Sequence, residues 1–320
     1  MKNEYVTLCR SDISTYMGKR IEKSPTILGH EIVGRIVAVA PGAPAADLNG
    51  MLLHEGKRIT WAIYASDPDS EMSRLGIPQK SPDLFKYGHE QLTETNTLNG
   101  GLAEYTIIRK NTPVIVLSED VPVNAAAIIN CSVSTVAGAI RLTGGVEGKR
   151  VALWGTGMLG IIACAQYREA GVREIIAVDI NSERLALAGR FGATQTMKAG
   201  ELDPSLLKAD CTIDFSGNLA SMGATVDALR IGGTAVWVGG VCPQEPIRLD
   251  TEKIVRNLYT IKGLHNYNAD DFRAAVSFME KHHADYPISE LIYDGFTLDQ
   301  TEEAFRYAID NNPFRVGIHF

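Results

Sequence analysis

The spacing of hydrophobic and polar positions divides the chain into three segments. In residues 1–122, short apolar runs lie between glycines and prolines, which predicts strands joined by turns. The clearest runs are ILGHEIVGRIVAVAPG, GKRITWAIYA, GGLAEYTIIRK and TPVIVLSED. An alanine-rich segment follows, NAAAIINCSVSTVAGAIRLTGG, and it predicts a helix that ends at Gly144 and Gly145. The first segment is therefore expected to form a β-rich domain.

Residues 123–265 alternate between buried strands and helices that end near glycines. The predicted strands are KRVALWG, REIIAVDI, CTIDFSG, TAVWVGG and YTIKGLH. The predicted helices between them are MLGIIACAQYREAG, SERLALAGRFGA and LASMGATVDALRIGG. Strands that alternate with helices form a parallel sheet with right-handed crossovers. This segment predicts an α/β fold with a doubly wound parallel sheet.

Residues 266–320 form the third segment, in which helix and strand patterns alternate twice. The order is a helix DDFRAAVSFMEKHH, a short strand, a helix TEEAFRYAIDN and a final strand FRVGIHF. We find no internal repeat and no segment of low complexity. The chain is long enough for about two domains of roughly 100–200 residues each.

Charge and composition restrict the partners and the compartment. The 320 residues carry a formal net charge of −7 and are 45% hydrophobic, as in a globular protein. No basic run is present, which argues against nucleic acid or an anionic membrane surface as a partner. No apolar stretch approaches the roughly 20 residues that span a bilayer, and the first residues, MKNEYVTL, lack a signal-peptide pattern. The five cysteines are dispersed, so we expect reduced thiols and a cytoplasmic protein.

A glycine-rich turn follows the predicted strand KRVALWG. Its sequence, GTGMLG, opens the next helix, and Asp179 ends the following strand 19 residues after Gly160. This strand–turn–helix setting makes the pattern a fingerprint for a dinucleotide bound to a Rossmann fold. The glycines allow the backbone to approach a pyrophosphate at the positive end of the helix. The predicted contacts are Gly155, Gly157, Met158, Leu159 and Gly160.

Asp179 determines which dinucleotide is expected. Its carboxylate can accept hydrogen bonds from the adenosine ribose hydroxyls and would repel a 2′-phosphate, so NAD is predicted over NADP. We also place Arg184 near the cofactor, although it lies too far along the next helix to be an obvious phosphate clamp. The alternative is a flavodoxin-like or other α/β sheet that carries a glycine-rich turn by chance.

Three residues predict a metal site in the β-rich segments. Cys9 and His30 lie 21 residues apart, and Cys131 lies in the alanine-rich helix. Two thiolates and an imidazole suit zinc, and three protein ligands leave one tetrahedral position open, as in catalytic sites. Asp12 is placed to orient the His30 ring from behind. Taken singly, each cysteine has an alternative role as a small core residue, and the histidine as one satisfied within a turn.

A polar stretch, ASDPDSEMSRLGIPQKS at residues 65–81, raises a second metal question. Asp67, Ser70, Ser73 and Ser81 are separated by two, two and seven residues, a spacing that a four-cysteine zinc lobe would use. Oxygen groups do not form a stable zinc site of the thiolate kind. The stretch therefore predicts either an ordinary loop or a lobe without its metal.

The chain resembles the zinc-dependent medium-chain alcohol dehydrogenases over nearly its whole length. The motifs that carry the resemblance, in family order, are CRSD, GHEIVGRIVAV, GKRITW, GGLAEY, NCSVSTVAGAI, GTGMLG, AVDINSERL and FRVGIHF. Within the family it looks closest to alcohol dehydrogenases linked to phosphonate catabolism and to cyclitol dehydrogenases, through IPQKSPDLFKYGHE and RNLYTIKGLHNYN. The resemblance implies a GroES-like catalytic domain in 1–122, a Rossmann domain in 123–265 and a return to the catalytic domain in 266–320.

The resemblance also implies roles for single residues. Cys9, His30 and Cys131 would hold the catalytic zinc, and Glu31 would lie behind the metal as an occasional ligand. Ser11 would hydrogen-bond the alcohol and begin proton transfer. The chain has Ser14 where a helper histidine often continues the relay, which puts the second step in doubt. Further cofactor contacts are implied for Val238, Gly239, Leu264 and Arg315.

The implied enzyme transfers a hydride between a polar secondary alcohol and NAD, with one catalytic zinc and no structural zinc. The alcohol would be a polyol, a cyclitol or a hydroxyphosphonate. A homodimer or homotetramer is expected, because the strand near YTIKGLH pairs with its symmetry mate in the resembling family. Only eight residues precede CRSD where relatives carry some thirty more, so we expect either an internal Met1 or a truncated first domain. The alternative function is a non-catalytic NAD-binding relative with a role in assembly or sensing.

Overall fold

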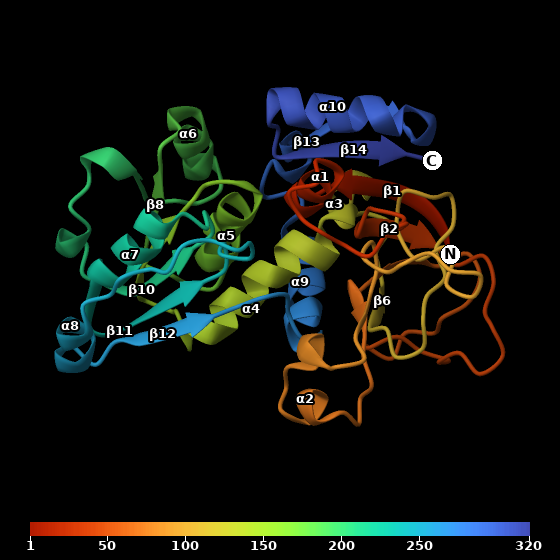
Figure 1. Cartoon of the computed structure of the whole chain (residues 1–320), viewed down its shortest axis with the longest axis horizontal. Helices are drawn as coiled ribbons and strands as arrows, with labels where there is room; N and C mark the ends of the chain where they lie inside the picture. Colours follow the sequence, from red (N-terminus) through yellow and green to blue (C-terminus); the bar gives the residue numbers. More distant parts are fainter. The chain divides into compact units, whose positions relative to one another are not determined.

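The computed structural model describes all residues from Met1 to Phe320, and they form two units (Figure 1). The first unit joins Met1–Ser134 to Tyr267–Phe320, and the second is Thr135–Asn266. The sequence predicted a boundary after residue 122, but α3 (Val123–Ala127) packs on strands of the first unit and extends it. The return to the first unit lies within one residue of the predicted position.

The first unit contains a mixed six-stranded sheet in the order β13-β14-β1-β2-β3-β6. Its central strand β1 pairs antiparallel with β2 on one side and with the last strand, β14, on the other, so the two ends of the chain lie side by side (Figure 1). The bounds are β1 Lys2–Leu8, β2 Glu31–Arg35, β3 Arg58–Trp61, β6 Val114–Val116, β13 Ile292–Thr297 and β14 Arg315–His319.

Helices cover this sheet with apolar faces. The helix α10 (Thr301–Asn311) is amphipathic and buries Ala304, Phe305 and Ala308 against the sheet core. Besides α3 and the short α2 (Glu71–Arg74), the unit contains α1 Arg10–Tyr16 and α9 Ala269–His282. The first turn of α9 is closed by the Asn268–Asp271 capping box. No helix of the chain is both long and apolar enough to cross a membrane.

The predicted strand GGLAEYTIIRK is not formed. Apart from an isolated bridge between Lys2 and Tyr105, this segment is irregular. A Cβ on Gly100 would lie 1.9 Å from the Ile27 carbonyl oxygen, and the Gly101 amide donates to the Gly29 carbonyl. The backbone of this segment therefore forms hydrogen bonds with neighbouring loops rather than with a paired strand.

The second unit is a six-stranded parallel sheet in the order β12-β11-β10-β7-β8-β9, which is the Rossmann order predicted from the sequence. The strands are β7 Arg150–Trp154, β8 Glu174–Asp179, β9 Gln195–Lys198, β10 Ala209–Asp214, β11 Leu229–Trp237 and β12 Thr260–Gly263. The connecting helices are α5 Met158–Glu169, α6 Ser182–Arg190, α7 Leu219–Asp227 and α8 Thr251–Arg256. The predicted helix LASMGATVDALRIGG is shorter than expected, because Leu229 already pairs with Ala209 as the start of β11.

The lobe of residues 66–81 is held by hydroxyl groups. It contains one short helix, α2 (Glu71–Arg74), whose first turn is capped by Ser70 accepting from the Ser73 amide. The Ser70 hydroxyl also lies 2.8 Å from that of Ser81 and 3.0 Å from that of Ser73, which donates to the Asp67 carbonyl. The four positions with zinc-lobe spacing thus meet through hydrogen bonds. The absence of a structural zinc stays a prediction.

We expect Ser70→Ala to loosen the lobe. The substitution removes the N-cap of α2 and the hydroxyl that contacts both Ser73 and Ser81. Loss of an N-cap typically lowers the free energy of unfolding by about 0.5–2 kcal/mol. Amide hydrogen exchange of residues 71–76 should accelerate. Ser66→Ala removes a nearby hydroxyl that is not part of the Ser70–Ser73–Ser81 hydrogen bonds, so it should leave the exchange rates unchanged. Equal rates in both variants and the native chain would show that the hydroxyls do not hold this segment.

Candidate metal centre and cofactor site

Four ligand-type side chains converge at the end of β1. The donor atoms of Cys9, His30, Glu31 and Cys131 all lie within 4.8 Å of one another. Cys9 follows β1 and caps α1, while His30 directly precedes β2 and Glu31 is its first residue. The antiparallel register places Thr7 opposite Glu31, so Cys9 emerges beside His30. The three zinc ligands predicted from the sequence are therefore brought together by the structure.

Cys131 reaches this cluster from a π-helix, Ile129–Val133. The wider turn brings three consecutive side chains to the same place. The Cys131 Sγ lies 3.5 Å from His30 Nε2, and Asn130 Nδ2 donates to the His30 carbonyl at 3.0 Å. The Ser132 hydroxyl lies 3.1 Å from Glu31 Oε1. Sequence patterns predicted a regular helix here and missed Asn130 and Ser132.

Asp12 orients the His30 ring, in the place that the sequence predicted. Its Oδ1 lies 3.1 Å from His30 Nδ1, and its two oxygens also accept from the amides of Cys9 and Gly29. Burial opposes a charged ring, but the Asp12 carboxylate raises the pKa of His30 to about 10. A metal cation at Nε2 would displace the proton there, while Asp12 keeps the proton on Nδ1.

Arg315 and Glu31 form a buried ion pair behind the ligands. The guanidinium donates to both Glu31 oxygens, at 2.6 and 2.8 Å, and to the Ser132 hydroxyl at 2.7 Å. It also lies 3.5 Å from the Cys9 sulfur. Thr7 donates to Glu31 Oε2 at 2.6 Å. The structure thus places Arg315 on Glu31 within the first unit, and its predicted role at the cofactor stays a prediction.

The pKa values of the Cys9 and Cys131 thiols are shifted in opposite directions. The hydrogen bond from Cys131 and the charge of Arg315 lower the pKa of Cys9 against the effect of burial. The same hydrogen bond and burial raise the pKa of Cys131. A cation that replaces the shared proton would receive two thiolates, one imidazole and a nearby carboxylate. This donor set fits zinc.

The predicted relay residues lie on α1. Ser11 and Ser14 are both half-buried, and the Ser11 carbonyl accepts from the Thr15 hydroxyl at 3.0 Å. Ser11 is two residues after the ligand Cys9, which keeps it close to the metal centre. The Ser14 carbonyl accepts from the amides of Lys19 and Arg20 and so ends the helix.

The glycine-rich turn of the second unit has the close contacts that a dinucleotide site requires. Gly155 adopts a φ of +92°, and a Cβ there would lie 2.8 Å from the Ser216 amide. A Cβ on Gly160 would lie 1.9 Å from the Gly155 carbonyl oxygen. A Cβ on Gly157 would meet nothing within 4 Å, so the start of α5 has open space beside its free amides. Met158 and Leu159 form the first turn of this helix, and the arrangement fits a pyrophosphate.

Asp179 ends β8 and is already hydrogen-bonded to the turn. Its Oδ2 accepts from the amide and hydroxyl of Thr156, at 2.6 and 2.9 Å, and its Oδ1 accepts from the Asn181 amide. Arg184 lies in the first turn of α6. Thr156 was not predicted from the sequence, although it lies inside the fingerprint.

The other predicted cofactor residues lie at the carboxyl ends of neighbouring strands. The amides of Val238 and Gly239 donate to the Asp214 carbonyl, and a Cβ on Gly239 would lie 2.1 Å from the Gly217 amide. Leu264 follows β12, and its amide donates to Trp237. Asp214 itself was missed, although an acid at the end of the strand CTIDFSG was a signal for it.

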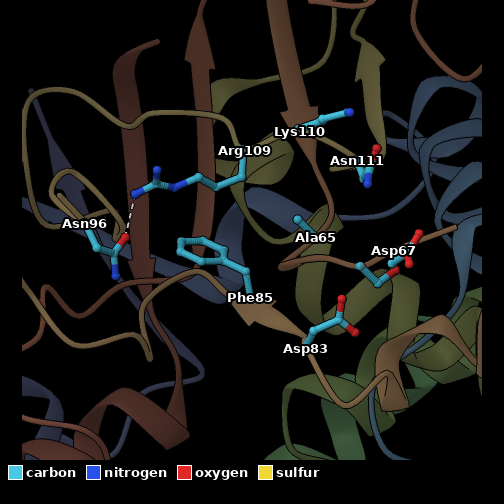
Figure 2. A pocket seen from close by; sticks show the side chains of 9 residues that line it. Ala65, Asp67, Asp83, Phe85, Asn96, Arg109, Lys110 and Asn111 are labelled. Atoms are coloured by element: carbon cyan, nitrogen blue, oxygen red, sulfur yellow. Dashed lines mark hydrogen bonds between the residues drawn. The ribbon is translucent and has the colours of Figure 1, made fainter. Parts of the chain in front are cut away.

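A shallow groove of about 470 Å³ lies elsewhere in the first unit, between the lobe and β5 (Phe85–Lys86) (Figure 2). Figure 2 shows Arg109 above the Phe85 ring, 5.1 Å from its centroid, with Asp67 and Asp83 on the other side. None of the metal ligands lines this groove.

Two family models match separate parts of the chain. Residues 1–119 match the family model for the alcohol dehydrogenase GroES-like domain, and residues 158–281 match the model for zinc-binding dehydrogenase. The chain is 25% identical to an L-threonine 3-dehydrogenase of Saccharopolyspora erythraea, covering 90% of this chain and 80% of the relative. It is 26% identical to sorbitol dehydrogenase 1 of Saccharomyces cerevisiae, with 94% and 84% covered.

The fold is shared with a crystal structure of an alcohol dehydrogenase from Thermotoga maritima, with a TM-score of 0.92 and 24% identity over 99% of this chain and 90% of that one. The expected closer likeness to phosphonate-linked and cyclitol enzymes is not supported, because the relatives reported above are named for threonine and sorbitol. The two family models flank the helix that carries Cys131 and together include Cys9, His30 and most of the Rossmann unit. The chain thus belongs to the zinc-dependent medium-chain alcohol dehydrogenase family, whose members are NAD(P)-dependent oxidoreductases.

Proposed function

We propose that the chain oxidises a polar secondary alcohol with NAD, using one zinc held by Cys9, His30 and Cys131. The observation that carries the proposal is the convergence of these three donors from distant parts of the sequence. The candidate alcohols are a polyol, a cyclitol and a hydroxyphosphonate. A protein that only bound NAD would not need this donor set, which argues against the non-catalytic alternative.

The chain's own residues would orient the reactants. When bound, zinc supplies Lewis-acid polarisation of the alcohol oxygen and NAD supplies the hydride acceptor. Asp12 fixes the His30 ring, and Arg315 holds Glu31 in place behind the thiols. The Ser11 hydroxyl would accept the alcohol proton at its Oγ while it donates its own proton onward, so that the serine stays neutral. Ser14 occupies the position of the helper histidine, so the proton from Ser11 would pass to Ser14 or to solvent.

The first prediction concerns metal content. We expect elemental analysis to find one zinc per chain. Cys9→Ser should remove most of it and lower NAD reduction roughly 100-fold or more, because catalysis would lose its Lewis acid. Binding of NAD to the Rossmann unit should persist in the variant. Cys242→Ser, at an exposed cysteine of that unit, is the matched control and should behave like the native chain. Two zinc ions per chain would contradict the predicted count.

The second prediction concerns cofactor choice. Asp179→Asn removes the charge while keeping an oxygen that can accept from Thr156. We expect the preference for NAD over NADP, measured as the ratio of kcat/KM values, to narrow roughly tenfold, since a hydrogen bond to a charged group contributes about 1.5–3 kcal/mol. Asp299→Ala, at an exposed aspartate of the first unit, should leave the ratio unchanged. A native chain with a lower KM for NADP would overturn the assignment.

The third prediction concerns assembly. β12 is an edge strand of the Rossmann sheet and pairs only with β11, so its outer edge is open to a second copy. We expect a homodimer or a dimer of dimers. Light scattering at micromolar concentration should give about two or four times the 34.7 kDa of one chain. A mass of a single chain would refute this assembly.

A further inference from the structure

A charged group lies beside the metal ligands and has no part in the function described so far. Glu22 accepts from Arg20 at 2.6 Å, and its Oε1 lies 3.0 Å from His89 Nδ1. The His89 ring is 5.2 Å from that of His30, centroid to centroid. Lys86, on β5, interacts electrostatically with Glu22, His89 and Cys131. We call Arg20, Glu22, Lys86 and His89 the Lys86 group.

Strand geometry directs Lys86 to the side of the metal ligands. β5 pairs with β4 (Tyr64–Ala65), and successive residues of a strand point to opposite faces. Figure 2 shows Phe85 directed into the shallow groove beneath Arg109. Its neighbour Lys86 therefore faces the other way, where the Cys131 thiol lies within its electrostatic reach.

The Lys86 ammonium is half-buried and makes no hydrogen bond within the chain. Burial lowers its pKa, as do the charges of Arg20 and Lys80, whereas Cys131 and Glu22 act in the opposite direction. An ammonium group that loses water without gaining a partner is costly, and such groups are normally paired. Lys86 thus has donors available for a ligand.

The neighbouring charges do not neutralise Lys86. Arg20 already pairs with Glu22, which is the one carboxylate of the group. The Nδ1 atom of His89 lies 3.0 Å from the Glu22 carboxylate, so this ring also faces Glu22 rather than Lys86. The thiolates of Cys9 and Cys131 would be balanced by a bound divalent cation. The positive charge of Lys86 then has no carboxylate of its own, and it acts on Cys131.

We propose that Lys86 binds an anionic oxygen group of the substrate, a carboxylate or a phosphate or phosphonate, while the carbinol is held at the metal ligands. This inference rests on the proposed function and narrows its substrate class. Charge-assisted hydrogen bonds to such oxygens are about twice as strong as neutral ones. The enzyme is accordingly selective for alcohols that carry an anionic group over neutral polyols and cyclitols.

The test compares matched alcohols in calorimetric titrations of the zinc-loaded chain saturated with NADH, which cannot accept a hydride. One pair is 3-hydroxybutyrate and 1,3-butanediol, and the other is glycerol 3-phosphate and glycerol. We expect the native chain to bind at least one anionic member about tenfold more tightly than its neutral counterpart. The pair that shows the difference distinguishes carboxylate from phosphate.

Variants at Lys86 distinguish binding of the anionic group from a structural role of this lysine at the metal site. Lys86→Met should reduce the preference to about twofold or less, and Lys86→Arg should restore most of it because the charge returns. Lys110→Met removes an exposed lysine at the groove and should change nothing. Equal binding of charged and neutral alcohols by the native chain would overturn the proposal, as would an unchanged preference in Lys86→Met. Loss of zinc from Lys86→Met would also overturn it, since Lys86 would then support the metal.

The outcome is distinguishable from failure of the proposed function itself. A chain that holds no zinc and reduces NAD with no alcohol fails at the earlier step, whatever its charge preference. A chain that holds zinc and oxidises neutral alcohols at least as well as anionic ones retains the proposed function and refutes only the role of Lys86.

Discussion

The register of β1 against its two neighbours is the constraint on which the metal centre depends. Thr7 lies opposite Glu31 on β2 and opposite Gly317 on β14, and Cys9 comes two residues later, just after the end of β1. Side chains alternate between faces along a strand, so a slip of one residue would move Thr7 away from the Glu31 carboxylate. The first nine residues therefore position a ligand only because the last strand of the chain fixes β1 from the other side.

The buried pair of Arg315 and Glu31 connects this register to the ligands. Both side chains are almost wholly buried, at 2% and 0% exposure, so their charges are costly to desolvate. Thr7 and Ser132 satisfy the remaining hydrogen-bonding positions, which offsets part of that cost. Removing one partner of such a pair typically costs about 3–5 kcal/mol, because the other charge is left uncompensated. The pair holds the carboxylate beside the thiols, where a free glutamate would compete with them for the cation.

Periodicity and motif spacing predicted most of the Rossmann unit, because most of its strands and helices have clear local patterns. The strand β9 and the short helix α8 were missed. The ligands Cys9, His30 and Cys131 were predicted from residue type and resemblance. Of the partners that hold them, Asp12 was predicted, whereas Asn130 and Ser132 were not. Ser132 and Asn130 reach the site only because a π-helix widens the turn, and Arg315 meets Glu31 only through long-range strand pairing. Sequence spacing carries no information on which buried charge a strand residue will face.

The segment from the lobe to His89 carries both the serine contacts and Lys86. Three serine hydroxyls and the Asp67 carbonyl connect the four positions with zinc-lobe spacing through hydrogen bonds. The same segment returns through β5 and delivers Lys86 and His89 to the metal ligands. The conformation of β5 therefore connects the lobe to the side chains that would contact a substrate. The pairing of β5 with β4 fixes the backbone from which the Lys86 side chain extends.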